Sequence, residues 1–370
     1  MLKINPGHPK VWLSRDHIQF GLEAEAVTVG GLSPAHQRLL RSLEVGISEN
    51  QLPIITNSLK LEPASASLLL QQLKPVLLSN ETTMPSSHSD SRRFPFAQPH
   101  PDFAEIIRFG LRHNVSGEIG IQRRSARIVH IDDLARVGLT TIRGLASAGV
   151  TQFWCSDSNL VQESDTTALG YPKELLGWTR FMAADTLAKS FQNPVALVES
   201  SQLRARVLDR IDFAIVVAGQ VVDPKVAGRW WRRGIPHLAI TFDSSGTRVS
   251  PVVFPGKTPC LVCRENQIAS QDERHLVRLN QLLASKTAYD DSSSVLFAAS
   301  AATASALAQL DFEASFSTME HERQGTWFER KSGLVHRLTW PDGSACRCHD
   351  SETEGAANQT TETASVKPAA

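Results

Sequence analysis

The chain has 370 residues, 41% of them hydrophobic, and its 38 basic and 38 acidic residues give a formal net charge of zero. This length allows two domains with a substantial core, and the balanced charge provides no global basic surface for nucleic acid. No apolar run reaches the length of a bilayer span, and the N-terminal residues lack the apolar stretch of a signal peptide. We therefore expect a cytoplasmic protein that binds neither nucleic acid nor membrane.

Residues 1–78 are expected to form a small α+β module. Ser33-Pro34 predicts a helix start, because a hydroxyl side chain can cap a helix and proline suits its first position. Two more helical stretches are predicted at residues 48–58 and 64–74. Short strands are expected near residues 11–13, 18–22 and 26–29. Three short helices beside strands are typical of a winged-helix-like module.

Two segments have the composition of connecting or disordered chain. Residues 79–115 are predicted to be a linker and the segment leading into the core, since residues 79–102 are rich in Ser, Pro and polar residues. Residues 351–370 are polar, rich in Thr, Glu and Ala, and without periodicity, so we expect a disordered tail.

Residues 116–350 alternate predicted strands with predicted helices, which favours an α/β fold with a doubly wound, mostly parallel Rossmann-like sheet. The expected strands are 127–131, 152–156, 195–199, 213–218 and 237–242. The expected helices are 137–148, 174–190, 201–208 and 224–233. Further helices are predicted near 271–285 and 295–311, followed by strands within 325–340.

The first strand of this core runs into a helix at the place where a nucleotide-binding fold carries its glycine-rich loop. Only Gly138 remains of such a loop, and Asp132 and Asp133 stand where a phosphate would approach. Two carboxylates about 4 Å from a phosphate would each cost about 1 kcal/mol even at the dielectric constant of water. We expect these aspartates to cap the following helix instead.

Four of the five cysteines form two close pairs, Cys260/Cys263 and Cys346/Cys348. In a reducing cytosol such pairs favour metal binding over disulfides. Together they can supply the four thiolates of a closed, structural zinc site, with His349 as an alternative ligand. Four ordinary reduced cysteines are the other interpretation. Cys155, on a predicted strand, is expected to be a buried core residue.

Several short motifs connect this pattern to a known family. They are the Ala148-Gly149-Val150 helix end, the acidic strand end at Asp157, the Gly-Ile-Pro-His run at 234–237 and the Pro-Gly turn that feeds Pro-Cys-x-x-Cys at 254–263. From Arg127 to Cys348 the chain resembles the ThiF/MoeB/HesA superfamily, bacterial relatives of ubiquitin-activating enzymes. The N-terminal unit and the Cys-x-Cys ending are most similar to the actinobacterial ThiF-like partners of peptide cyclodehydratases.

The resemblance implies an ATP-dependent adenylyltransferase that activates the C-terminal carboxylate of a small protein or peptide. It places Gly138 in the phosphate loop and Asp157 at the ribose, and Arg180 is the nearest match to the family's lysine. Asp165 and Ala168 fall near the family's Asn and Arg. Arginine is not a safe substitute for the compact lysine ammonium, so this match is weak.

The run after the fourth core strand, residues 214–220, holds no carboxylate where the family places its magnesium ligand. Asp223 is close, but it precedes Pro224 and fits a helix cap better. Together with the two aspartates of the first loop, these departures give the hypothesis of a degenerate nucleotide site, vestigial at Gly138, Asp157 and Arg180, that no longer holds ATP and magnesium.

Three functions follow from these observations. The first is a scaffold in a peptide-modification pathway that binds a peptide or small protein and docks a catalytic partner, with a second copy of the chain as a further candidate partner. The second is a working ATP-dependent adenylyltransferase with a rebuilt loop, in which Arg136, Arg180 and Asp157 would matter first. The third is a DNA-binding winged-helix regulator, ranked last because the module's helices carry few basic residues.

Overall fold

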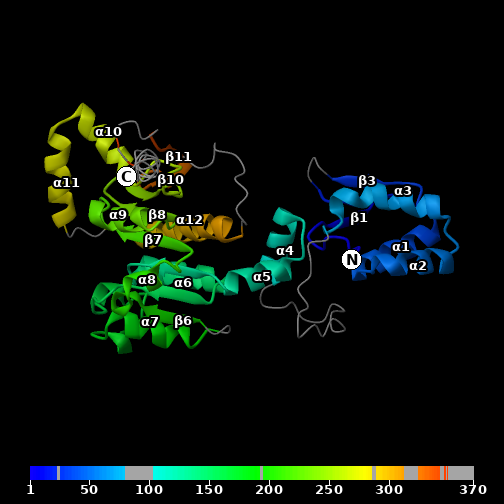
Figure 1. Cartoon of the computed structure of the whole chain (residues 1–370), viewed down its shortest axis with the longest axis horizontal. Helices are drawn as coiled ribbons and strands as arrows, with labels where there is room; N and C mark the ends of the chain where they lie inside the picture. Colours follow the sequence, from blue (N-terminus) through cyan, green and yellow to red (C-terminus); the bar gives the residue numbers. More distant parts are fainter. Residues whose placement is uncertain are drawn as a thin grey trace, which may run out of the picture. The chain divides into compact units, whose positions relative to one another are not determined.

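The computed structural model describes residues 1–22, 26–79, 103–191, 195–285, 289–311, 324–341, 346 and 348. The chain divides into two compact units, residues 1–123 (unit 1) and 124–370 (unit 2), which are drawn in Figure 1. The tail expected at 351–370, His349 and the part of the expected linker at 80–102 lie outside the described residues.

Unit 1 contains an antiparallel sheet in the order β1-β2-β3, with strands Lys10–Trp12, Ile18–Phe20 and Val27–Val29. Three helices follow, α1 (Pro34–Val45), α2 (Leu52–Ser58) and α3 (Pro63–Leu73). The Ser33 hydroxyl accepts the His36 N–H and Pro34 opens α1, as predicted. This unit is an α+β module, and its winged-helix assignment stays a prediction.

Two further helices follow in the chain, α4 (Phe103–His113) in unit 1 and α5 (Gly117–Ser125), which spans the boundary between the units at residue 123. The first of them lies in the segment that was expected to lead into the core, after the Ser- and Pro-rich residues 79–102. Within unit 1, the side-chain amide of Asn5 donates to the Gly110 carbonyl of α4 at 2.9 Å, so this helix packs on the N-terminal strand region.

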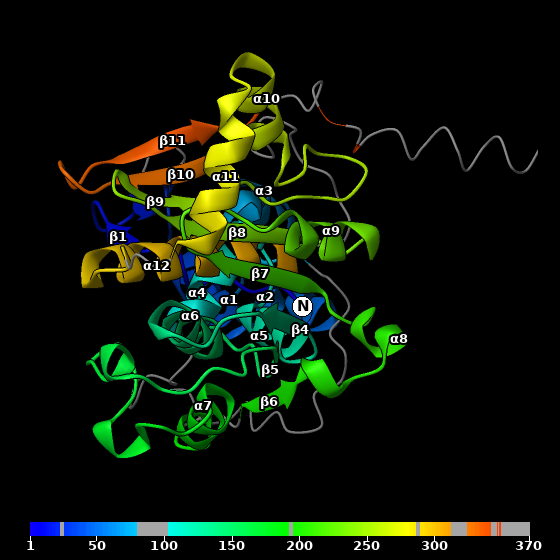
Figure 2. The ribbon, with the colours of Figure 1, turned by 90° about the vertical axis from the view of Figure 1, so that its left-hand side faces the viewer.

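Unit 2 is built on an eight-stranded mixed sheet in the order β11-β10-β9-β8-β7-β4-β5-β6, which Figure 2 shows from top to bottom. Five strands are parallel: β4 (Ile128–Ile131), β5 (Gln152–Cys155), β6 (Ala196–Glu199), β7 (Phe213–Ala218) and β8 (His237–Phe242). Three antiparallel strands extend one edge: β9 (Gly246–Val249), β10 (Gln324–Glu329) and β11 (Val335–Thr339).

Alternate residues of the parallel strands bury against helices on opposite faces of the sheet, which makes it doubly wound. Val129 of β4 packs with α6 (Arg136–Ser147), α7 (Arg180–Ala188) and α12 (Ser292–Leu310). Ile128, its neighbour, packs with α8 (Ala205–Leu208) and α9 (Pro224–Arg232), where Trp230 is buried. Figure 2 shows α6 and α12 to the left of the sheet and α8 and α9 to the right. The predicted α/β class is confirmed.

Three details differ from the sequence predictions. The helix expected from residue 174 begins at Arg180, because Thr179 caps it and accepts the Met182 N–H. Strand β9 and helix α10 (Cys263–Gln271) were not predicted. The helix expected near 271–285 is α11 (Arg274–Ala284).

Helix α12 is, within the described residues, long and apolar enough to cross a membrane by length and composition alone. Ala298, Ala302 and Ala306 on it are fully buried in the unit 2 core. A helix that packs on a sheet with small residues needs this apolar composition. Its burial therefore favours a core helix of a globular protein.

Candidate functional site

The point at which a doubly wound sheet reverses its strand order is where such folds bind ligands, at the carboxyl ends of the strands. In unit 2 this point lies between β4 and β7. The first residue after β4 is Asp132, whose carboxylate accepts the Val217 N–H of β7 at 2.8 Å. The side chain thus bridges the two strand ends, and the expectation that Asp132 caps α6 is wrong.

Carboxylates of the chain itself occupy the backbone donors of the loop between β4 and α6. The Leu134 N–H donates to Asp157 Oδ2 at 2.9 Å, and the Ala135 N–H donates to Asp133 Oδ1. Ala135 is the N-cap residue of α6, so Asp133 bonds the residue before the helix, and the expectation that its side chain caps the N–H groups of α6 is also wrong. A phosphate-binding loop turns such N–H groups toward the ligand. Here they are directed at side-chain oxygens.

Arg180, the first residue of α7, is surrounded by acidic groups. Its Nη1 lies 3.2 Å from Asp157 and its Nη2 lies 2.9 Å from Asp165, and Asp133 is 3.8 Å away. Only 12% of the side chain is exposed. The structure therefore brings together two of the predicted nucleotide residues, Asp157 and Arg180, but they are paired with each other.

We call Asp132, Asp133, Asp157 and Asp165 the carboxylate cluster. Loss of water raises the pKa of Asp132 to about 7, and the neighbouring Asp133 adds to the rise. The pKa of Asp133 is raised to about 6, again mainly by loss of water and then by Asp157. Both shifts have the sign expected for acids that share a confined space with other acids. The cluster is consequently an unfavourable place for further negative charge.

Other groups near the loop are also engaged within the chain. The Tyr171 hydroxyl donates to the Leu134 carbonyl at 2.6 Å, a contact that the sequence analysis missed. Arg136 pairs with Asp290 at 2.8 Å. Asp223 accepts the Lys225 N–H and caps α9, as predicted, and the end of β7 at residues 218–220 carries no carboxylate.

Gly138 has a steric role in the first turn of α6. A Cβ atom at this position would lie 1.7 Å from the Asp133 carbonyl oxygen, which belongs to the backbone and cannot swing away. This corresponds to the glycine that permits close helix–strand packing in dinucleotide folds. The residue is needed for packing whether or not a nucleotide binds.

Gly138→Ala is therefore expected to lower the free energy of unfolding by about 2–3 kcal/mol, because the new methyl group overpacks the loop. Gly219→Ala is the matched control, since a Cβ there meets nothing within 4 Å. We expect the control to change stability by less than about 0.5 kcal/mol in urea denaturation. Equal stability of the two variants would contradict this role of Gly138.

Asp132→Asn is expected to alter how stability depends on pH. The folded pKa of about 7 lies above the ordinary value of 3.8, so the folded state holds a proton that the unfolded state releases. The stabilisation is complete below about pH 4 and is lost as pH rises through 7. Asn keeps the acceptor for Val217 without the charge. We expect the variant to gain about 1–2 kcal/mol over the natural chain at pH 8 and little at pH 5. A gain independent of pH would contradict the assignment.

The four cysteines predicted to bind metal come together although Cys260 and Cys346 lie 86 positions apart in the sequence. The Sγ–Sγ distances are 3.6 Å for Cys260–Cys263, 3.7 Å for Cys260–Cys346 and 3.5 Å for Cys263–Cys348, and all four Sγ atoms lie within 4.8 Å of one another. A tetrahedron with Zn–S bonds of 2.3 Å has sulfurs about 3.8 Å apart. This cysteine cluster therefore fits a zinc ion.

The surroundings of the cysteine cluster favour a structural site. Cys263 opens α10, and the Trp340 indole N–H donates to the Cys260 carbonyl at 3.0 Å. Hydrogen bonds from neighbouring thiols, Cys263 first, lower the pKa of Cys260 to about 5. Four thiolates leave no open coordination position for a substrate. Cys155 lies elsewhere, fully buried in β5, as predicted, and burial raises its pKa.

Comparison with solved protein structures finds similar folds. E. coli MccB in complex with AMPCPP and MccA is similar with a TM-score of 0.64 and 11% identity, over 93% of this chain and 98% of that one. The chain has the fold of MccB. A second MccB structure, described as the Microcin C7 biosynthetic enzyme with N-formylated MccA, gives a TM-score of 0.63 at 11% identity over 94% and 99% of the two chains.

PaaA is also similar, with a TM-score of 0.58 and 15% identity over 78% of this chain and 96% of that one. No protein-family model and no curated protein sequence matches the chain. These structural likenesses agree with the fold that the resemblance to the ThiF/MoeB/HesA superfamily implied.

Proposed function

We propose that the chain is a ThiF-like partner protein of a cytoplasmic peptide-modification pathway, which binds a peptide or small protein and does not adenylate it. The observation that carries this proposal is the pair of hydrogen bonds from Leu134 and Ala135 to Asp157 and Asp133. They fill the position at which an active relative would present its backbone to ATP.

Electrostatics supports the same proposal. A bound triphosphate would have to displace two carboxylates from their N–H donors and then lie among the carboxylate cluster. Arg180 cannot offset this charge without giving up Asp157 and Asp165. Desolvated like charges repel strongly, so each step opposes binding. The alternative of an active adenylyltransferase requires this whole arrangement to rebuild when ATP arrives.

Unit 1 offers a surface suited to a peptide. Strand β1 forms one edge of its sheet, and Val11, Trp12 and the adjacent Leu13 are 37%, 44% and 54% exposed. An exposed edge strand with apolar side chains can pair with an extended peptide by strand addition. The cysteine cluster would hold a structural zinc ion that fixes α10 and the C-terminal strands of unit 2.

The proposal is tested by fluorescence anisotropy with labelled peptides encoded by genes beside this one. We expect saturable binding to the full chain. The double variant Val11→Ser/Trp12→Ser, which alters only exposed side chains, should bind at least about tenfold more weakly. This factor corresponds to about 1.4 kcal/mol of lost apolar contact. Val45→Ser, at a residue 80% exposed on α1, is the control. Pyrophosphate release on adding ATP and a bound peptide would contradict the proposal and support the adenylyltransferase.

A further inference from the structure

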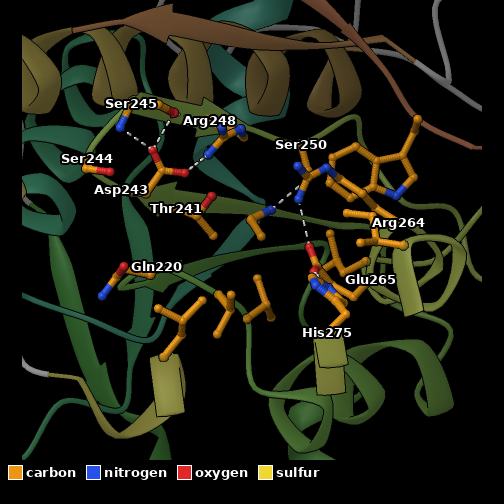
Figure 3. Close-up of a pocket in the computed structure, with 17 residues that line it drawn as sticks. Gln220, Thr241, Asp243, Ser244, Ser245, Arg248, Ser250, Arg264, Glu265 and His275 are labelled. Carbon is orange, nitrogen blue, oxygen red and sulfur yellow. Dashed lines mark hydrogen bonds and ion pairs between the residues drawn. The ribbon is translucent and has the colours of Figure 1, made fainter. Parts of the chain in front are cut away.

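Unit 2 contains a cavity of about 290 Å³ that is separate from the carboxylate cluster. It lies against β8, β9 and the turn between them, next to the carboxyl end of β7 and to helices α10 and α11 (Figure 3). Its size is at the lower end of the range for small-molecule pockets. A single amino-acid residue or a similar small molecule is the largest ligand that it can enclose.

The Asp243 carboxylate of this pocket is already engaged by donors of the chain. Asp243 accepts the Ser245 N–H at 2.7 Å, the Gly246 N–H at 3.0 Å and the Ser245 hydroxyl at 2.6 Å, and it pairs with Arg248. Figure 3 shows these groups gathered on one side of the pocket. A carboxylate with four donors has little capacity left for a ligand. This side of the pocket therefore does not attract a cation.

The opposite side retains unused donors. Glu265 accepts from Arg264 Nη1 at 2.8 Å and contacts His275 at 2.7 Å, so its two oxygens are engaged. Arg264 donates through Nη1, whereas its other N–H groups have no partner among the residues that the structure describes. The side chain is 32% exposed and lines the cavity. Its planar guanidinium can bind a carboxylate with two parallel hydrogen bonds.

Apolar side chains also line the cavity. They include Leu261, Ile268, Leu282 and Trp340. Trp340 is held by its hydrogen bond to the Cys260 carbonyl, and Arg264 directly follows Cys263, so both residues are fixed beside the cysteine cluster. The pocket thus combines apolar side chains with the remaining N–H donors of Arg264, which Glu265 holds in place through Nη1, and this is an arrangement that can recognise an acid carrying a hydrophobic group.

From this we infer that the pocket binds a small carboxylate attached to an apolar group, with Arg264 as the carboxylate-binding residue. The carboxylate can belong to a free acid or to the last residue of a peptide, and only the second case rests on the proposed function. The geometry does not depend on whether a nucleotide binds at the β4–α6 loop.

Calorimetric titration of the full chain with N-acetyl-L-phenylalanine tests this inference. A ligand of this size is expected to bind with a Kd of about 0.1–1 mM, and its amide at least about tenfold more weakly. Arg264→Gln should weaken binding by about tenfold, and Arg264→Lys by less. Arg278 forms an exposed pair with Asp272 outside the cavity, so Arg278→Gln should leave the binding of N-acetyl-L-phenylalanine unchanged. Ile268→Trp, which fills the cavity from its apolar wall, should also abolish binding.

Two peptides identify the source of the carboxylate. Acetyl-Gly-Gly-Gly-Gly-Phe with a free C-terminus should bind as well as N-acetyl-L-phenylalanine if the pocket takes a peptide end, and more weakly if it takes a free acid. Absence of saturation for N-acetyl-L-phenylalanine, equal binding of its amide, or unchanged binding by Arg264→Gln would each overturn the inference. Val11 and Trp12 lie outside this pocket, so the Val11→Ser/Trp12→Ser variant should still bind N-acetyl-L-phenylalanine. A failure of the inference about the pocket can therefore be distinguished from a failure of the proposed function.

Discussion

Substitution of Cys263 by Ser is expected to remove zinc from the purified protein and to lower Tm by about 10 °C. Cys263 lies in the middle of the cysteine cluster, in contact with both Cys260 and Cys348, and is 1% exposed. Loss of this thiolate would leave only three of the four thiolates that would hold a zinc ion between α10 and Cys346 and Cys348. Metal analysis and thermal denaturation measure the two effects together.

Cys155→Ala is the matched control for this experiment, because Cys155 is equally buried but far from the cysteine cluster in the fold. It should retain about one zinc per chain. The natural chain, purified without added zinc, should carry the same amount. Much less than one zinc in the natural chain, or full zinc in Cys263→Ser, would show that the four thiols are not a metal site.

Arg124→Met is expected to lower the free energy of unfolding by about 3–5 kcal/mol. Arg124 donates to both carboxylate oxygens of Asp311, at 2.6 and 2.8 Å, and to the Ala148 carbonyl at 2.8 Å. Both side chains are 0% exposed. The substitution would remove the Arg124 charge and two hydrogen bonds from the buried Asp311 carboxylate at the end of α12, and this is the main cost.

Arg127→Gln provides the comparison, since Arg127 forms a similar 3.0 Å pair with Asp212 that is 35% and 27% exposed. We expect this control to cost less than about 1 kcal/mol in urea denaturation. The double variant Arg124→Met/Asp311→Leu should recover much of the stability, because it removes the buried Asp311 charge together with that of Arg124. If Arg124→Met lowered the free energy of unfolding no more than Arg127→Gln does, the claim that burial makes the Arg124–Asp311 pair important for stability would be contradicted.

The sheet of unit 2 was predictable because its parallel strands are short apolar runs bounded by turn residues. Phe213–Ala218 and His237–Phe242 have the predicted bounds. Strand β9 carries Gly246 and Arg248 in four residues, so its sequence does not identify it, and pairing with β8 and β10 makes it a strand. Helix α4 was not predicted, because residues 103–115 were assigned only as a segment leading into the core.

The candidate sites show the same difference between features that adjacent residues determine and features that depend on residues far apart in the sequence. Cys-x-x-Cys and Cys-x-Cys are compact motifs, so the cysteine cluster could be predicted from spacing and metal chemistry alone. The pairing of Arg180 could not, since its partners lie 15 and 23 residues away in loops whose course depends on the whole fold. The Arg124–Asp311 pair spans 187 residues and leaves no pattern in the sequence.

Calorimetric titration of the natural chain with magnesium-ATP tests the central claim most directly. With the Leu134 and Ala135 N–H groups bonded to the chain's own carboxylates, we expect no saturable heat up to about 1 mM ATP. A dissociation constant in the micromolar range would contradict the claim that these aspartates have replaced the nucleotide.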